Sequence, residues 1–555
     1  MLKENFVEWL HESIKNHWSM PAFSDLNEPA VTYGQVAQKI KWCHHLYEKA
    51  DIKRGDKITL LGRNSVNWAI IYLATVTYGA VIVPILPDFH PADYHHIIKN
   101  SDSVLVFAAD NLFDKLEETR LPEVEAILSL KDFHLLYSRK KNFSKIIQKA
   151  EESFLKHYGG SLSPDSFTFE PSRNDELAAI LYTSGTSGFS KGAMLQHNCL
   201  ISNVRFAKNN IDLRSGDRIL SFLPAAHAFG CAFDVLFPFS IGCHVTFLGQ
   251  MPSPKVLIQA MEQVRPRLIL SVPLLIEKIY KKNIKPKLDK PAVKVMSKIP
   301  GLNSIIYKKI RTKLVELFGG NFIEIVIGGA ALNEEVEAFL TKIDFPFTIG
   351  YGMTECGPLI SYIPYPKNRK TAVGKVIDTL DVRIDSSVTG ATDGTGEIQV
   401  RGENVMIGYY KNPEATKEAI DENKWLHTGD IGEIDSDGFI YIRGRHKSML
   451  LGPSGQNIYP EEIEAILNNM PYVEESLVIE KDKKIIALVY PSMEKVDAEG
   501  LKESELIEKM EENRVVLNEQ LPVYSRVVKI ELYPSEFEKT PTKKIKRFLY
   551  TISQG

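Results

Sequence analysis

The chain has 555 residues, enough for about three to four structural units of roughly 150 residues each. Hydrophobic residues make up 44% of the chain and charged residues 25%, the composition of an ordinary globular protein with a large core. The net charge of −3 argues against nucleic acid as the main partner, because no excess of cations is available to displace counterions.

The beginning of the chain and the cysteines both indicate a cytoplasmic protein. Residues 1–18 mix charged and apolar side chains and lack the apolar core of a secretory signal. The five cysteines are scattered and form no CxxC pair, so we expect neither a disulfide framework nor a zinc site. A reducing compartment suits this pattern.

The stretch from Ser65 to Pro87 carries no charged residue and is long enough to span a bilayer. Its character changes midway, however, because a helix-like run ends at Gly79 and the β-branched run 80–85 follows it. These features favour a buried helix followed by a buried strand over a membrane span. Peripheral association with a membrane surface stays open.

Farther along, the pattern predicts an α/β fold. Apolar runs typical of buried strands alternate with amphipathic stretches, which favours mainly parallel sheets. These runs are 57–62, 103–109, 178–183, 267–272, 322–329 and 345–352. After about Leu380, period-two alternation with Gly and Asp turns predicts an antiparallel β region. From Lys447 onward, a charge-rich tail with two strand-like runs and a polar helix at 501–520 predicts a small separate α+β domain.

A loop rich in glycine and hydroxyl residues, YTSGTSGFSKG (182–192), follows one of these strand-like runs. Glycines let backbone amides approach a ligand, hydroxyls can donate to phosphate oxygens, and Lys191 adds a positive charge. The loop does not match GxxxxGK[ST], because no Ser or Thr follows Lys191 in register. Composition alone leaves two interpretations open, a phosphate-binding loop and a polar surface loop.

Five ordered blocks resolve that choice, because together they resemble the adenylate-forming superfamily of acyl-CoA synthetases, luciferases and peptide-synthetase adenylation domains. The blocks are YTSGTSGFSKGAM (182–194), IGGAALN (327–333), IGYGMTECGP (349–358), WLHTGDIGEIDSDGFIYIRGR (425–445) and PTKKIKR (541–547). GEIQVRGENVMIGYYKNPEAT (396–416) is also similar to the stretch that precedes the HTGD block in this family. The chain is therefore identified as a member, most like the medium- and long-chain fatty acyl-CoA synthetases of bacterial type.

The resemblance implies that a carboxylic acid is activated with ATP, which requires positive charge where the carboxylate meets the α-phosphate. It implies that the glycine-rich loop holds the β- and γ-phosphates. The loop residues in this role are Thr183, Ser184, Gly185, Thr186, Ser187, Gly188 and Lys191. Glu355 matches the ligand of Mg²⁺, which is commonly held by a carboxylate plus substrate phosphates. Outside this block, Glu355 would be an ordinary solvated acid.

Two blocks match the wall around the adenine and the α-phosphate. By resemblance, Gly329 and Ala330 form the wall beside adenine, where small residues suit a flat ring. Tyr351 lies against the ring, next to Gly352, and Thr354 contacts the α-phosphate.

The HTGD block and the residues after it match the ribose site and a hinge. Asp430 corresponds to the aspartate that accepts from both ribose hydroxyls, and Arg445 to an arginine that also contacts the ribose. Lys447 occupies the hinge position, about which the small domain rotates in this family. The next residue is usually acidic and is Ser448 here, which leaves the local hinge contacts open.

These matches predict two domains, an AMP-binding domain at 1–446 and a mobile C-terminal domain at 447–555. The last block places the adenylating lysine at Lys544, with Lys543 where the general pattern has glycine. Lys543 and Lys546 are expected to be bystanders. Without the alignment, such a cluster of cations would be a solvated basic face.

The segment 222–248 is rich in aromatic and small apolar residues and contributes to the acyl pocket by family position. His227 matches the histidine of the family's LPxxH block, which is more often a wall of the pocket than an acid–base catalyst. The apolar lining and the form of the PTKKIKR block favour medium or long acyl chains, although a segment of the ordinary hydrophobic core would have the same apolar composition.

The resulting hypothesis is an ATP-dependent fatty acid:CoA ligase that uses Mg²⁺ and forms an acyl-AMP intermediate. One alternative delivers the acyl group to an acyl-carrier protein or another acceptor. A more remote alternative is a nucleotide-binding protein without ligase activity. We expect a cytoplasmic protein, at most peripherally attached to a membrane and with no nucleic-acid partner.

Overall fold

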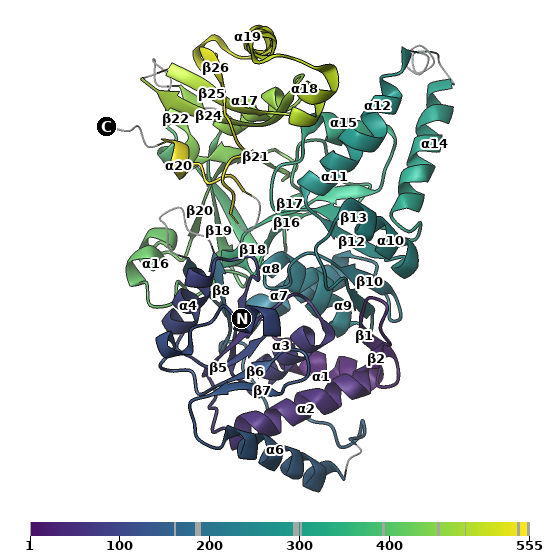
Figure 1. Ribbon diagram of the computed structural model, residues 1–555, viewed down its shortest axis with the longest axis vertical. Coiled ribbons are helices and arrows are strands. Elements are labelled where there is room, and N and C mark those ends of the chain that lie inside the picture. Colours follow the sequence, from purple (N-terminus) through teal and green to yellow (C-terminus); the bar gives the residue numbers. More distant parts are fainter. Residues whose placement is uncertain are drawn as a thin grey trace.

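The computed structural model describes residues 2–159, 162–183, 190–291, 299, 302–390, 394–451, 456–482, 484–540 and 544–551. Two large sheets flanked by helices form the lower and middle parts of the molecule in Figure 1, and a β-rich region joins them to a small C-terminal domain above. This mixed α/β architecture, with parallel sheets and a small C-terminal domain, confirms the predicted fold class.

The first large sheet has the strand order β7-β6-β5-β3-β4-β8-β9. Its strands are β3 Lys57–Leu61, β4 Val81–Ile85, β5 Ser103–Ala108, β6 Ala126–Ser129, β7 Leu135–Ser138, β8 Leu177–Thr183 and β9 Lys191–Gln196. Its helices are α2 Tyr33–Lys49, α3 Val66–Tyr78, α4 Pro91–Asn100, α5 Asp110–Phe113, η1 Glu118–Arg120 and α6 Phe143–Tyr158. The inner pairs are parallel, whereas β6–β7 and β8–β9 at the two edges are antiparallel. The glycine-rich loop therefore joins two antiparallel neighbours.

The second large sheet has the order β14-β13-β12-β10-β11-β1-β2 and is parallel except at β1–β2. Its strands are β1 Pro21–Asp25, β2 Val31–Thr32, β10 Arg218–Ser221, β11 His244–Phe247, β12 Leu268–Ser271, β13 Glu324–Ile327 and β14 Phe347–Ile349. The associated helices are α1 Phe6–Asn16, α7 His197–Asn210, α8 Ala228–Gly230, η2 Cys231–Leu236, α9 Phe237–Ser240, α10 Pro254–Val264, α11 Pro273–Ile279, η3 Tyr280–Ile284, α12 Lys285–Leu288, α14 Leu302–Leu317 and α15 Glu334–Lys342.

The charge-free stretch 65–87 forms the helix α3 and the strand β4, as predicted. Ser65 caps α3 by accepting from the backbone amide of Trp68, and Gly79 ends it with φ of +88°. Nearly all of α3 is buried, and β4 is buried along its whole length. Within the described part of the chain, no helix combines the length and apolar character that crossing a membrane requires.

The β-rich region is antiparallel, as its alternating sequence predicted. Its strands are β15 Tyr351–Gly352, β16 Leu359–Tyr362, β17 Lys375–Val376, β18 Leu380–Asp385, β19 Gly396–Gly402, β20 Leu426–Ile434 and β21 Ile440–Arg445. Its short helices are η4 Thr354–Cys356, η5 Ser386–Val388 and α16 Pro413–Ala419.

The C-terminal part packs around hydrophobic clusters of its own, apart from the main core. Its strands are β22 Leu450–Leu451, β23 Asn457–Ile458, β24 Val473–Lys481, β25 Lys484–Pro491 and β26 Lys529–Leu532. Its helices are η6 His446–Ser448, α17 Pro460–Leu467, α18 Met493–Glu499, α19 Glu503–Gln520, η7 Val523–Ser525 and α20 Phe548–Thr551. The polar helix expected at 501–520 is α19.

Candidate active site

The carboxyl ends of β13 and β14 define one edge of the candidate site. The two strands are parallel neighbours, with Ile327 opposite Ile349, so the segments that follow them leave the sheet together. Gly329 and Ala330 are exposed directly after β13. Gly329 has φ of +90°, a conformation that favours glycine, and open space surrounds the position of a Cβ there.

A hydrogen-bonded triad of Tyr351, Asp430 and Arg445 extends from this edge. The Tyr351 hydroxyl donates to Oδ2 of Asp430 at 2.7 Å, and Nε of Arg445 lies 2.8 Å from Oδ1 of the same carboxylate. Asp430 and Arg445 are direct partners in the pairing of β20 with β21. Burial, reinforced by the Asp430 charge, raises the pKa of Tyr351, which keeps its hydroxyl a donor.

A second line of contacts joins Glu355 to Lys191 through Tyr409. The Tyr409 hydroxyl donates to Oε1 of the buried Glu355 at 2.8 Å. Nζ of Lys191 lies 5.3 Å from the centre of the same tyrosine ring, within the range of a cation–π contact. The sequence analysis did not single out Tyr409, although it lies in the family-like block 396–416.

The residues around Glu355 fit a divalent cation. Oε1 accepts from Tyr409, and among the described residues no donor contacts Oε2. A carboxylate oxygen of this kind is a preferred ligand of Mg²⁺. Thr354, half-buried beside it in η4, lies on the same turn.

The two ends of the glycine-rich loop are fixed by β8 and β9. Thr183 and Lys191 are opposite each other in this antiparallel pair, and the Thr183 hydroxyl approaches the backbone oxygen of Lys191 at 3.5 Å. The predicted phosphate contacts at Ser184, Gly185, Thr186, Ser187 and Gly188 lie outside the described residues.

Lys544 comes from the C-terminal domain and lies close to the groups above. Its backbone is held by Thr540, whose hydroxyl accepts from the Lys544 amide at 3.2 Å. Its side chain is accessible to solvent, yet desolvation lowers its pKa, and the Arg445 charge adds to this effect. The charges of Asp430 and Glu355 oppose it. Four charged groups predicted from three separate blocks therefore interact in one place.

His227 lies within electrostatic range of Lys544. Burial lowers its pKa to about 4, and the positive charge of Lys544 contributes to the shift, so the imidazole is neutral at pH 7. Its Nδ1 accepts from the amide of Phe229 at 3.4 Å, at the start of a continuous helical run through α8, η2 and α9. At Gly230 in this run, a Cβ would lie 2.7 Å from the Pro224 backbone oxygen.

The middle of that run, η2, is a π-helix that contains the buried Asp234. Asp234 is 1% exposed, and its Oδ2 has no hydrogen-bond partner among the described residues. Burial raises the pKa of this carboxyl well above its usual range, which favours its protonated form.

The predicted hinge residue Lys447 is exposed in η6, two residues after Arg445. The next residue, Ser448, donates its hydroxyl to Oε1 of Glu461 at 2.6 Å, which gives the unusual serine a defined partner. Asn333, which caps α15 of the large domain, donates to Oδ1 of Asn469 at 2.7 Å. The small domain is thus tied to the large one beside the site.

The structure also describes Gly352 and Lys546, two of the remaining residues that the motifs singled out. A Cβ on Gly352 would lie 2.1 Å from the Pro358 backbone oxygen, so the strand contact requires glycine. Lys546 forms an ion pair with Glu538 at 2.5 Å, whereas Lys543 lies outside the described residues.

Comparisons with known proteins agree on the family of this chain. A family model described as AMP-binding enzyme matches residues 10–410, and another described as AMP-binding enzyme C-terminal domain matches residues 448–549. The chain is 26% identical over 517 residues to long-chain-fatty-acid–CoA ligase ACSBG2 of Rattus norvegicus, covering 87% of this chain and 76% of that protein. It is 29% identical over 533 residues to 4-coumarate–CoA ligase CCL1 of Humulus lupulus, covering 93% and 88%. The ATP-bound structure of MatB from Rhodopseudomonas palustris has a TM-score of 0.76 at 22% identity and covers 99% and 98%, a likeness of fold.

Proposed function

We propose that this chain, which belongs to the AMP-binding enzyme family and is an acid–thiol ligase, activates a medium- or long-chain fatty acid. In the first step, a carboxylate oxygen attacks the α-phosphorus of ATP, and the bond to the departing pyrophosphate breaks. In the second step, the sulfur of CoA attacks the acyl carbon, and AMP leaves with the electron pair of the acyl–oxygen bond.

The observation that carries the proposal is the meeting of Lys544 with Glu355, Asp430 and Arg445. In the proposed role, the Lys544 ammonium lies beside the carboxylate and the α-phosphate and offsets the charge that accumulates as they join.

The nucleotide is proposed to bind along the edge of β13 and β14. Adenine would pack between Tyr351 and the exposed backbone of Gly329 and Ala330. Asp430 would accept from the ribose hydroxyls, while its contacts with Tyr351 and Arg445 fix its orientation.

The phosphates are proposed to lie between the glycine-rich loop and Glu355. Lys191 would contact the departing pyrophosphate, and Thr354 the α-phosphate. Glu355, oriented by Tyr409, would hold Mg²⁺ through its uncontacted oxygen. When bound there, the ion supplies charge neutralisation to the phosphate oxygens.

The acyl chain is proposed to pass His227 and the helical run that follows it. A neutral His227 suits an apolar pocket, because it brings no charge that would need a partner. The small domain at 447–555 is proposed to rotate about Lys447 between the two steps. The present arrangement, with Lys544 within electrostatic range of Asp430 and Glu355, suits the first step.

A panel of saturated acids of increasing length, scored for CoA-dependent formation of AMP, tests the proposed substrate. We expect kcat/KM to rise by roughly fourfold for each added methylene until the pocket is full, since each contributes about 0.8 kcal/mol. A flat profile, or a preference for short or aromatic acids, would contradict a fatty-acid substrate.

The same assay separates the alternative acceptors. We expect CoA to support turnover and an acyl-carrier protein in its place to support little. Faster transfer to the carrier protein would favour the alternative acceptor. Failure to release pyrophosphate with any acid would indicate a nucleotide-binding protein without ligase activity.

A further inference from the structure

An arm built from α11, η3, α12 and α14 carries an unusual concentration of positive charge. The stretches 278–290 and 303–313 contain ten lysine or arginine residues and one acid, Asp289, in a chain whose net charge is −3. Figure 1 shows this arm along the right side of the molecule, beside the C-terminal domain.

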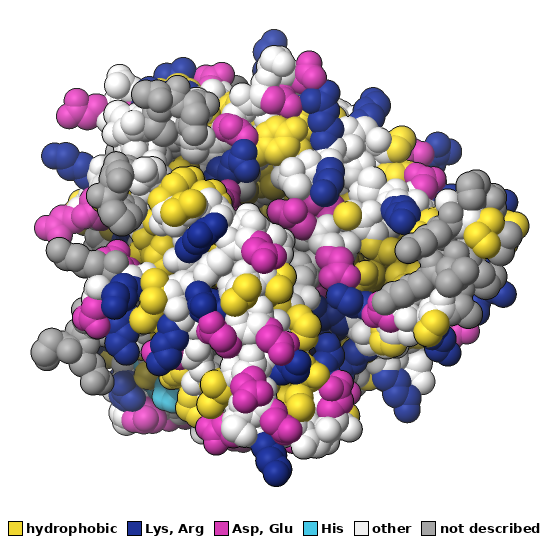
Figure 2. Space-filling view, turned by 90° about the horizontal axis from the view of Figure 1, so that it is seen from above, with side chains coloured by type: hydrophobic (Ala, Val, Ile, Leu, Met, Phe, Trp, Pro, Cys, Tyr) yellow, Lys and Arg dark blue, Asp and Glu magenta, His cyan; other side chains and the backbone are white. Residues whose placement is uncertain are grey.

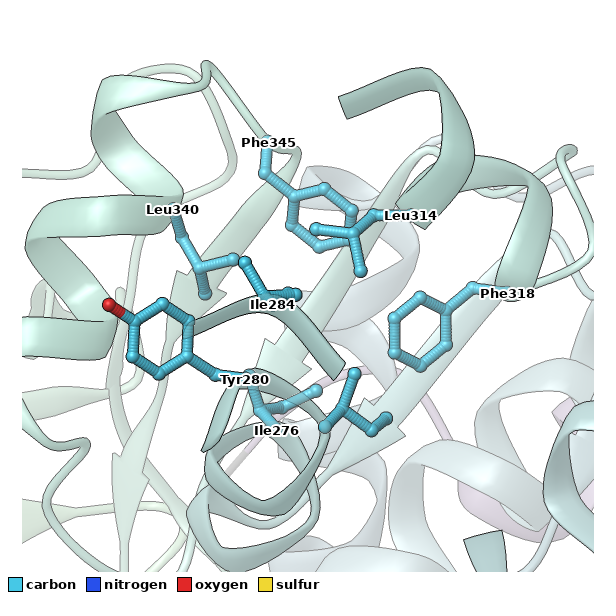
Figure 3. Close-up of a pocket in the computed structure, with 8 residues that line it drawn as sticks. Ile276, Tyr280, Ile284, Leu314, Phe318, Leu340 and Phe345 are labelled. Atoms are coloured by element: carbon cyan, nitrogen blue, oxygen red, sulfur yellow. The ribbon is translucent and has the colours of Figure 1, made fainter. Parts of the chain in front are cut away.

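The inner face of the arm is apolar. Ile284 of η3 faces Leu314 of α14 and Phe318, which follows that helix, across a small cavity at the base of the arm (Figure 3). The cavity measures about 10 Å³, about enough for one water molecule and too little for an acyl chain. This packing holds the helices together and leaves the lysines on the outer face.

Four of these ten side chains make contacts within the protein. Lys285 pairs with Glu335 at 2.7 Å and Arg311 with Asp344 at 3.4 Å. Lys281 and Lys282 contact the small domain at Asn468 and Glu494. The other six are exposed and form no ion pair with a described residue. They are Lys278, Lys287, Lys290, Lys308, Lys309 and Lys313.

Three of these six lie on one face of α14 together with an exposed isoleucine. Ile305, Lys308, Lys309, Thr312, Lys313 and Glu316 line a single surface hollow on this helix. Ile305 is 68% exposed, and Ile299, just before the helix, is 44% exposed. Figure 2 shows dark blue cationic and yellow hydrophobic side chains together on the lobe at the right, which is this arm seen from above.

We propose that the outer face of α14 docks on an anionic lipid surface. Juxtamembrane lysines gain favourable electrostatic energy near anionic headgroups, and an exposed apolar side chain among them can enter the interface. An acidic protein partner is less suited, because precise docking on carboxylates favours the planar fork of arginine. The only arginine of these stretches, Arg311, already pairs with Asp344.

The proposal does not depend on which acid the enzyme activates. Flotation of the full-length protein with phosphatidylcholine vesicles, with or without an equal part of phosphatidylglycerol, tests it directly. We expect binding to the anionic vesicles only, and loss of binding at high salt. The triple variant K308Q/K309Q/K313Q should weaken this binding by roughly a hundredfold, given the usual gain per lysine near such a surface.

The matched control is K145Q/K149Q/K156Q on α6, which removes the same charge from another exposed helix. It should bind the vesicles nearly as well as the wild type. A second pair compares Ile305→Asn with Leu155→Asn, a residue of α6 that is 47% exposed. Only Ile305→Asn should reduce binding.

Equal effects of the two triple variants would overturn the proposal, as would equal binding to neutral vesicles. Binding to an acidic carrier protein, without binding to anionic vesicles, would overturn it in favour of a protein partner. Acid-dependent pyrophosphate exchange in solution should be the same for both triple variants and the wild type, which shows that they are folded.

Discussion

Tyr409 is the residue that connects the two ends of the phosphate region. Its hydroxyl donates to Glu355, and its ring lies under Lys191, so one side chain orients both the acid and the cation. The sequence contained the surrounding block but gave no sign of this contact, because 54 residues separate Tyr409 from Glu355. The contact depends on the packing of the segment around Tyr409 against both β9, through a bridge to Ala193, and η4.

Tyr409→Phe should lower the rate of adenylation about tenfold at limiting Mg²⁺, since hydrogen bonds to charged groups contribute about 1.5–3 kcal/mol. Raising the Mg²⁺ concentration should restore much of the rate, because the carboxylate itself remains. Titration of pyrophosphate exchange with Mg²⁺ measures this.

The control is Tyr410→Phe, which removes a hydroxyl that binds Asp102 at 2.9 Å instead. It should leave the Mg²⁺ dependence unchanged. Identical titration curves for the two variants would show that Tyr409 has no role in orienting Glu355.

The buried Asp234 is predicted to make the free energy of unfolding depend on pH. Its raised pKa keeps the folded carboxyl protonated to a higher pH than the unfolded carboxyl, which ionises above about pH 4. The unfolded state therefore gains relative stability as the pH rises from this value toward the folded pKa. Asp234→Asn removes this penalty and should stabilise the protein by about 1–2 kcal/mol at pH 8, with less effect near pH 5.

Thermal unfolding of Asp234→Asn and wild type across this pH range measures the difference. Asp165→Asn, at an exposed position, should show no such trend. A stabilisation by Asp234→Asn that did not grow with pH would contradict a buried neutral carboxyl.

At the scale of elements, hydrophobic patterning predicted much of the fold. The change of pattern at Gly79 separated α3 from β4, and the alternation after Leu380 predicted antiparallel strands. Hydrophobic patterning could not predict the order of the strands in each sheet. It also could not predict that β8 and β9 form an antiparallel pair at the edge of their sheet. Those features depend on contacts between residues far apart in sequence.

Motif resemblance predicted the members of the candidate site better than their mutual contacts. Tyr351 and Asp430 were assigned to separate parts of the nucleotide, yet the structure joins them by a hydrogen bond. That bond requires β15, which contains Tyr351, to meet β20, which no local pattern encodes. Ser448, an exception to the family pattern, donates to the nearby Arg445 backbone oxygen and also to Glu461, which α17 places next to it.

The short η6 segment supports a prediction about the hinge. Lys447→Pro fixes φ at one residue and so restricts the rotation proposed for the small domain. We expect adenylation within about twofold of wild type and thioester formation slowed at least about tenfold, the pattern of an impaired conformational step.

Lys447→Ala removes the same charge without restricting the backbone, so both steps should stay near wild type. Single-turnover measurements of acyl-AMP formation and of its conversion to the thioester separate the two steps. Equal slowing of both steps by Lys447→Pro would argue against a hinge there.

At the scale of the whole molecule, the site is completed by two parts of the chain that pack as separate cores. The large part supplies Glu355, Asp430 and Arg445, and the small part supplies Lys544. The contact of Asn333 with Asn469 and that of Lys281 with Asn468 hold the parts in this arrangement. In the proposed mechanism, an arrangement of this kind separates the two half-reactions, because Lys544 is assigned a role only in the first.

The most direct test of this account is to measure the two half-reactions of Lys544→Ala separately, with Lys546→Ala as the matched control. Lys544→Ala should lower acid-dependent pyrophosphate exchange at least about a hundredfold, the usual effect of removing a group that stabilises transition-state charge. It should still convert supplied acyl-AMP and CoA to acyl-CoA at nearly the wild-type rate, and Lys546→Ala should retain both activities. Undiminished pyrophosphate exchange in Lys544→Ala would contradict the account.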